Sequence, residues 1–201
     1  GRCVVAGGIR RSAQIAFGEP GDEQFLDLKA DPAKVEDYRW VSNNSIFAEV
    51  GMDYSGAAGR TVRNGEPGYL WLENARAYGR MKDEADWADA AAEGSNPCVE
   101  QTLWDRELCC LVETYPAHHD DLEDYLQTLR VAYQYAKTVT LVPTQDKRTN
   151  AVMLRNRRIG CSMTGIVQAI NRLGFRRFFQ WCDEAYYHVQ YLDEKYSDWL
   201  C

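Results

Sequence analysis

Apolar side chains recur at helical spacing in the second half of the chain. Within residues 121–139 they return at steps of three and four, the period at which one face of an α-helix repeats. The apolar run at residues 166–174 and the aromatic-rich segment at 177–200 are also typical of helices. We therefore predict three helices after residue 120.

Short apolar runs elsewhere indicate strands. Residues 4–6 and 9–17 have a strand-like pattern, and residues 69–72 and 108–114 are two further strand candidates, with turn residues beside them. Because strand candidates alternate with helix candidates along the chain, the pattern predicts an α/β fold with parallel strands.

The remaining segments are polar or rich in glycine. Residues 22–40 are expected to be partly helical, with a helix start at the Asp-Pro pair 31–32, since proline is favoured in the first turn. The Asn-Asn-Ser run at 43–45 is expected to interrupt regular structure. Residues 52–68 and 94–97 predict loops.

Composition and charge limit the classes of function. The 201 residues fit a single domain, 45% of them are hydrophobic, and the net charge is −7. A chain this acidic is a poor candidate for binding polymeric nucleic acid, which requires Lys and Arg against the phosphates. A single nucleotide needs only a local group of donors. No run approaches 18 apolar residues, so we expect no membrane span.

The cysteines indicate a reducing compartment. There are seven, an odd number, in a sequence that starts without a signal peptide and reads at both ends as a fragment. This predicts reduced thiols and a cytoplasmic location. The sequence has no CxxC pair and no His/Cys cluster at zinc spacing, and the adjacent His118 and His119 are expected on the surface. No metal site is therefore predicted.

The segment around Cys98 is the most informative for chemistry. Asn96 lies two residues before this cysteine and Glu100 two residues after it, so in an extended loop all three side chains point to the same side. A neighbouring carboxylate raises the pKa of a thiol, which argues against a protease-type nucleophile and suits a neutral thiol that gives up a hydrogen atom. The alternative from the residues alone is a turn with a buried Cys98 and a solvated Glu100.

Five segments, in the same order, resemble the adenosylcobalamin-dependent branch of the ribonucleotide reductases. The segment that resembles the radical-cysteine loop of these enzymes is NPCVEQTLWDRELCCLVETYP. The segment that looks like their specificity loop is VVAGGIRRSAQIAFG. The other three are RWVSNNSIF, GEPGYLWLENA and RNRRIGCSMTGI. The resemblance covers nearly the whole chain.

The resemblance implies a role for each matching residue. Cys98 would become a thiyl radical and abstract the ribose 3′-hydrogen, Glu100 would act as general base on the 3′-hydroxyl, and Asn96 would hydrogen-bond the ribose. Cys109 would be one of the two redox-active cysteines, while Cys110 would point away from it into the core. We expect Asn96, Cys98 and Glu100 to line one cavity, with Cys98 poorly exposed and Cys109 facing it.

The specificity loop would pass the identity of a bound effector to the substrate base. The matching residues are Gly7, Gly8, Arg10 and Arg11, of which the glycines would give the loop its freedom to move. The alternative is an ordinary glycine turn followed by surface arginines.

The family also implies a fold, a reaction and partners. The expected fold is part of a ten-stranded α/β barrel with a central finger loop, with residues 1–201 as a single partial catalytic domain. The reaction is the reduction of ribonucleoside di- or triphosphates to deoxyribonucleotides for DNA synthesis. The implied cofactor is adenosylcobalamin, although no residue of this chain can be assigned to its binding. The implied partners are a ribonucleotide substrate, a deoxynucleotide effector and a thioredoxin-like dithiol reductant.

Three alternatives to this interpretation remain open. One is the reductase class that receives its radical from a separate metal-containing subunit, and another is a barrel fragment without catalysis. The third is a glycyl-radical enzyme with a related barrel. The first redox cysteine of the family is expected before residue 1, since Cys3 lies too close to the specificity loop, and the phosphate-binding Pro-Ser-Gly-Thr segment is expected after Cys201.

Overall fold

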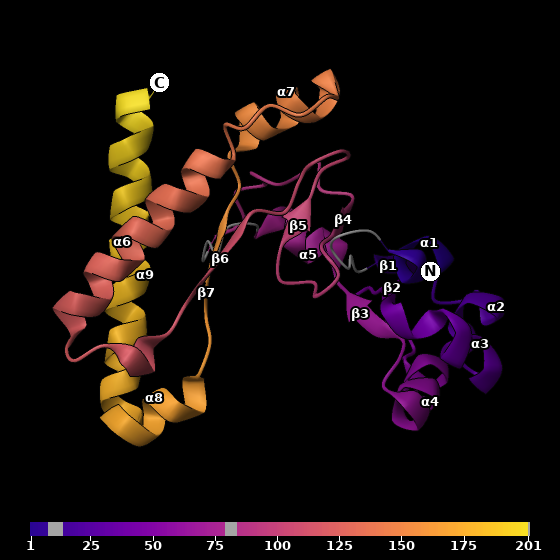
Figure 1. Ribbon diagram of the computed structural model, residues 1–201. Helices are drawn as coiled ribbons and strands as arrows, with labels where there is room; N and C mark the ends of the chain where they lie inside the picture. Colours follow the sequence, from indigo (N-terminus) through magenta and orange to yellow (C-terminus); the bar gives the residue numbers. More distant parts are fainter. Residues whose placement is uncertain (8–13, 79–83, 201) are drawn as a thin grey trace. The chain divides into compact units, whose positions relative to one another are not determined.

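The computed structural model describes residues 1–7, 14–78 and 84–200 of the chain. It divides into two compact units, Gly1–Asp105 and Arg106–Cys201, whose elements are labelled in Figure 1. Each unit has its own parallel strands and helices, and each is described by itself.

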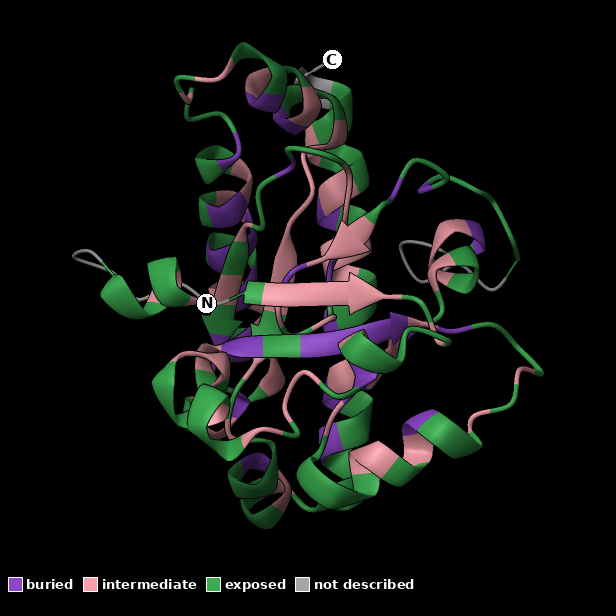
Figure 2. Cartoon of the chain, turned by 90° about the vertical axis from the view of Figure 1, so that its right-hand side faces the viewer, coloured by how far each residue is buried: buried purple, intermediate pink, exposed green. Residues whose placement is uncertain are grey.

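A three-stranded parallel sheet forms the centre of the first unit. Its strands are β1 (Gln14–Gly18), β2 (Ser42–Phe47) and β3 (Gly68–Leu70), in the order β1-β2-β3. The middle strand β2 is largely buried and lies beside the less buried β1, as Figure 2 shows. Residues 45–47 of β2 pair with β3, whereas residues 42–44 pair with β1 alone.

Short helices connect these strands. They are α1 (Arg2–Ala6), α2 (Glu23–Leu26), α3 (Pro32–Asp37), the 3-10 helix η1 (Arg39–Val41), α4 (Ser55–Asn64) and α5 (Leu72–Ala77). Helices α2 and α4 cover one face of the sheet, because Leu26 and Ala57 pack against the fully buried Ile46 of β2. This contact forms the core of the unit.

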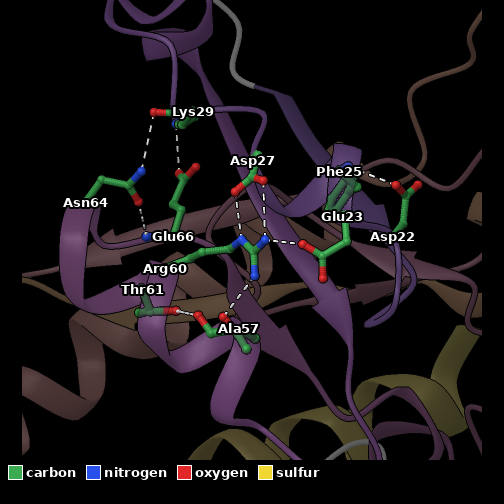
Figure 3. Close-up of polar contacts among 11 residues, drawn as sticks. Asp22, Glu23, Phe25, Asp27, Lys29, Ala57, Arg60, Thr61, Asn64 and Glu66 are labelled. Atoms are coloured by element: carbon green, nitrogen blue, oxygen red, sulfur yellow. Dashed lines mark hydrogen bonds and ion pairs between the residues drawn. The ribbon is translucent and has the colours of Figure 1, made fainter.

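An ion-pair cluster holds α4 to the segment that contains α2 (Figure 3). Arg60 of α4 donates to Asp27 at 2.7 Å through Nε and also bonds Glu23. Lys29 and Glu66 form a second, largely buried pair at 2.8 Å. Both pairs connect the segment 23–29, which contains α2 and the residues after it, to the segment 60–66, which contains the end of α4 and the residues after it.

An antiparallel hairpin completes the first unit. Its strands β4 (Gly94–Ser95) and β5 (Thr102–Leu103) have two residues each, with Ser95 opposite Thr102. The six residues between them form the loop that contains Cys98.

The second unit has two parallel strands packed with helices. The strands are β6 (Leu111–Thr114) and β7 (Gly160–Met163). The helices are the 3-10 helix η2 (Pro116–His118), α6 (Leu122–Val139), α7 (Lys147–Asn156), α8 (Ile166–Leu173) and α9 (Phe175–Leu200). Helices α6 and α9 share the core, where the buried rings of Tyr125 and Trp181 stack with centroids 5.8 Å apart.

The structure confirms the α/β class and most of the periodic elements. The three helices expected after residue 120 are α6, α8 and α9. The strands of the β1-β2-β3 sheet and of the β6-β7 pair are parallel, as expected. Helix α3 begins at Pro32, as expected, and the Asp31 side chain caps it by accepting from the N–H groups of Ala33 and Lys34. Within the described residues, no helix is both long and apolar enough to cross a membrane.

Four local expectations were wrong. Residues 4–6 lie in α1 instead of a strand, since the N–H groups of Val5 and Gly7 bond back to carbonyls four residues earlier. The run 43–45 continues through the middle of β2. Residues 52–68 contain α4, which Ala57 anchors in the core, because tertiary packing stabilises helices that propensity alone does not.

The fourth correction concerns the strand expected at 108–114. It begins only at Leu111, so Cys109 and Cys110 precede β6. Elements α5, α7, β5, β7 and η2 were not expected at all, and Gly94 and Ser95 of the expected loop form β4. These differences change the conformation expected for the segment with Cys98 and for the segment with Cys109 and Cys110.

Candidate active site

A tight turn shapes the loop that carries Cys98. The carbonyl of Asn96 accepts from the N–H of Val99 at 3.0 Å, and the N–H of Asn96 donates to the Gln101 carbonyl at 3.0 Å. Pro97 takes the second position of the turn, which its fixed φ favours. Val99 has a positive φ of 68°, so the chain reverses direction immediately after Cys98.

The side chain of Asn96 closes this loop from inside. Asn96 is only 5% exposed. Its Oδ1 accepts from the N–H of Gln101 at 3.1 Å, and its Nδ2 donates to Oε1 of Glu100. The amide and the carboxylate predicted to serve one substrate are thus in direct contact.

Cys98 lies at the exposed tip of the turn. The expectation that it is poorly exposed was wrong for the described chain, and so was the buried cysteine of the alternative interpretation. The reason is geometric: the segment turns instead of extending, so the alternation that would align Asn96, Cys98 and Glu100 is lost. Their catalytic roles stay predictions.

Hydrogen bonds of two side chains, Asn43 and Asp89, connect the hairpin to the rest of its unit. At the tip, Asn43 of β2 donates from Nδ2 to the Pro97 carbonyl at 2.6 Å. At the outgoing strand, the carboxylate of Asp89, which is fully buried, accepts from Oγ1 of Thr102 and from Nε1 of Trp104 at 3.1 Å. Sequence reasoning missed Asn43 and Asp89, because the run 43–45 was expected to interrupt regular structure and nothing in the sequence connected either residue to the hairpin.

The second cysteine segment belongs to the other unit. Cys109 is exposed, whereas Cys110 is half-buried. Cys110 is thus the more buried of the two, but it lies before the strand and outside the buried core in which it was expected. The segment is held by its backbone: the Cys110 carbonyl accepts from the N–H of Gly160 at 2.9 Å, and the N–H of Leu108 lies 3.2 Å from Sδ of Met153. That Cys109 faces Cys98 stays a prediction.

A buried ion pair lies immediately before these cysteines. The Glu107 side chain is completely buried, and its Oε1 accepts from Nε of Arg158 and from Nδ2 of Asn156, each at 3.1 Å. Burial raises the pKa of the Cys110 thiol, and the negative charge of Glu107 raises it further. Cys110 is therefore held in its protonated, less reactive form.

Only part of the expected specificity loop is described. Gly7 ends α1 with φ at 56°, a conformation in which glycine carries little strain. Gly8, Arg10 and Arg11 lie outside the described residues.

No metal centre is found in the ranges that the structure describes, where no three His, Cys, Asp or Glu side chains are grouped to hold an ion. His118 is exposed, and Nδ1 of His119 pairs with Asp124 at 2.7 Å. No described residue is identifiable as a cobalamin contact.

Comparison with known proteins identifies one group of relatives. No protein-family model matches the chain. It is 53% identical, over its full length, to a probable adenosylcobalamin-dependent ribonucleoside-triphosphate reductase of Dictyostelium discoideum and to the adenosylcobalamin-dependent enzyme of Euglena gracilis. The corresponding enzyme of Lactobacillus leichmannii is 38% identical over 88% of the chain.

A solved structure agrees with these relatives. The crystal structure of a B12-dependent (class II) ribonucleotide reductase matches 92% of the chain with a TM-score of 0.80 and 31% identity. The chain covers 30% of that structure, and it spans only 27% and 28% of the Dictyostelium and Euglena relatives.

The contrast between the two adjacent cysteines predicts different alkylation profiles. In the full-length protein that contains this chain, iodoacetamide should label exposed Cys109 faster than Cys110 at mildly alkaline pH. Labelling of Cys110 should rise only at higher pH, because a raised pKa leaves less thiolate. Mass spectrometry of each cysteine across a pH series measures both profiles.

The charge of Glu107 can be tested in the same assay. Glu107→Gln should shift the Cys110 profile to lower pH, since it removes a negative charge that disfavours the thiolate. The matched control is Glu113→Gln, an exposed position of the same charge, which should leave the profile in place. A Cys110 profile that ignores Glu107→Gln would refute this electrostatic assignment.

Proposed function

Because the chain is homologous along its whole length to part of the adenosylcobalamin-dependent (class II) ribonucleotide reductases, we propose that it supplies the radical-cysteine loop of such an enzyme. The complete protein would reduce ribonucleotides to deoxyribonucleotides for DNA synthesis. The observation that carries the proposal is the Asn96–Glu100 contact around Cys98, within a chain 53% identical to named reductases.

The three loop residues divide the first chemical step between them. Cys98, as a thiyl radical, takes the hydrogen atom from the ribose 3′-carbon and becomes a thiol, leaving the radical on the sugar. Glu100 accepts the proton of the 3′-hydroxyl, for which it must lie within hydrogen-bond reach of the substrate. Asn96 orients that carboxylate through Nδ2.

The reduction itself requires two electrons and a second pair of thiols. The 2′-hydroxyl leaves as water. Two cysteine thiols supply the two electrons and two protons, and they are oxidised to a disulfide. Cys98 then returns its hydrogen atom to the 3′-carbon, and Glu100 returns its proton to the 3′-oxygen. We propose Cys109 as one of these thiols, because it is exposed and outside the strand, and a cysteine outside this chain as the other.

The same proposal extends to fold and partners. The parallel strands of both units would be parts of one ten-stranded α/β barrel, with the β4–β5 hairpin as its finger loop. The substrate would be a ribonucleoside triphosphate, as in the names of the relatives. A deoxynucleotide effector would act on Gly7, Gly8, Arg10 and Arg11, and a thioredoxin-like dithiol would reduce the disulfide in the cytoplasm.

Cofactor dependence tests the class of enzyme directly. The full-length protein should form deoxyribonucleotides with adenosylcobalamin and a dithiol, with no second subunit added, because the relatives are named for this cofactor. Product is measured by chromatography with and without the cofactor. Turnover that ignores adenosylcobalamin and requires a metal-containing partner subunit would contradict the proposal.

The two adjacent cysteines provide a sharper test of the redox role. In the full-length protein, Cys109→Ser should allow at most one round of reduction and block continued turnover with a dithiol, because the disulfide can no longer form. Cys110→Ser is the matched control and should continue to turn over. The opposite result, with Cys110 essential and Cys109 dispensable, would show that the redox role belongs to Cys110.

A further inference from the structure

Asn43 occupies a position where asparagine is unfavourable. It lies in β2, the middle strand of its sheet, directly opposite Ile15 of β1 and at a level that β3 does not reach. Asparagine is depleted in strands, where β-branched and aromatic side chains pack better. Residues that conflict with the preference of their own strand are expected at functional sites, so we expect Asn43 to make a contact beyond the strand.

The alternation of side chains directs Asn43 to the hairpin. Ile46 points to the face covered by α2 and α4, so Asn43 and Phe47 point to the opposite face. There Phe47 stacks on Phe17 with centroids 5.2 Å apart, and a Cβ placed on Gly94 of the hairpin would lie 3.4 Å from the Phe17 ring. The hairpin therefore packs on the face that presents Asn43.

The contact that Asn43 makes controls the peptide before Cys98. Its Nδ2 donates to the Pro97 carbonyl at 2.6 Å, and this oxygen belongs to the planar peptide group that also contains the Cys98 N–H. The ring of Pro97 already fixes φ of that residue. Rotation about ψ of Pro97 would turn the Pro97–Cys98 peptide, and the amide of Asn43 restrains this rotation together with the Val99–Asn96 bond of the turn.

We infer that Asn43 is a positioning residue, which sets the direction of the Cys98 side chain by holding the carbonyl of Pro97. This inference rests on the proposed function of Cys98. Hydrogen-atom transfer depends steeply on the placement of the sulfur, and a misplacement of about 1 Å costs on the order of a hundredfold in rate. Asn43 itself is exposed and outside the core, so its loss should alter the loop more than the fold.

The test compares Asn43→Asp with wild type in the full-length enzyme. This nearly isosteric change replaces the amide donor by a carboxylate, which repels the Pro97 carbonyl. We expect kcat to fall by about ten- to a hundredfold with KM for the nucleotide within about threefold, because substrate binding is not the step affected. Asn43→Ala, which removes the donor without adding charge, should show the same split.

A second measurement does not depend on turnover. Iodoacetamide labelling of Cys98, measured relative to the exposed Cys3 in the same sample, should rise severalfold in both Asn43 variants because the loop is released. The matched control is Asn64→Asp, which removes another side-chain donor to a carbonyl, that of Lys29 at 3.3 Å. It should leave kcat and Cys98 labelling unchanged.

The outcomes separate this inference from the proposed function. If Cys98→Ser abolishes turnover while both Asn43 variants keep kcat within about twofold of wild type, the proposed function stands and the inference fails. A loss of kcat without a change in Cys98 labelling, or an equal loss in Asn64→Asp, would also overturn it. Should Asn43→Asp fail to fold, Asn43→Ala decides by the same criteria.

Discussion

The buried amide of Asn96 is the interaction on which the Cys98 loop depends. Its two polar atoms join the N–H of Gln101 and the carboxylate of Glu100, so one side chain both closes the turn and places the candidate base. A neutral hydrogen bond contributes about 1 kcal/mol net, while a buried group left without its partner costs about 1–3 kcal/mol. These two bonds therefore favour the loop conformation in which Glu100 stays in contact with Asn96.

The segment that contains Cys109 and Cys110 is anchored by a buried ion pair instead of a buried amide. Glu107 is completely buried against Arg158, and breaking such a pair typically costs about 3–5 kcal/mol because one charge is left uncompensated. This pair ties the residues before Cys109 to the end of α7, whose Asn156 adds a further bond. The strand starts at Leu111, after this pair, and the two cysteines between them differ in exposure.

Sequence reasoning was accurate where long periodic segments determine structure and failed where tertiary contacts do. Helices α6 and α9 follow from their apolar period, and the helix start at Pro32 follows from local chemistry. In contrast, the buried asparagine-rich strand β2 and helix α4 form because of neighbours far along the chain. The exposed position of Cys98 depends on the positive φ of Val99, which no residue preference indicated, and the anchors Asn43 and Asp89 are recognisable only once the hairpin is folded.

The most direct test of the central claim follows the hydrogen atom that Cys98 is proposed to remove. A ribonucleotide deuterated at the 3′-carbon is given to the full-length enzyme, and its turnover is compared with that of the unlabelled substrate. The account predicts slower turnover of the deuterated nucleotide and no turnover of either substrate by Cys98→Ser. Equal rates for the two substrates, together with an active Cys98→Ser enzyme, would contradict it.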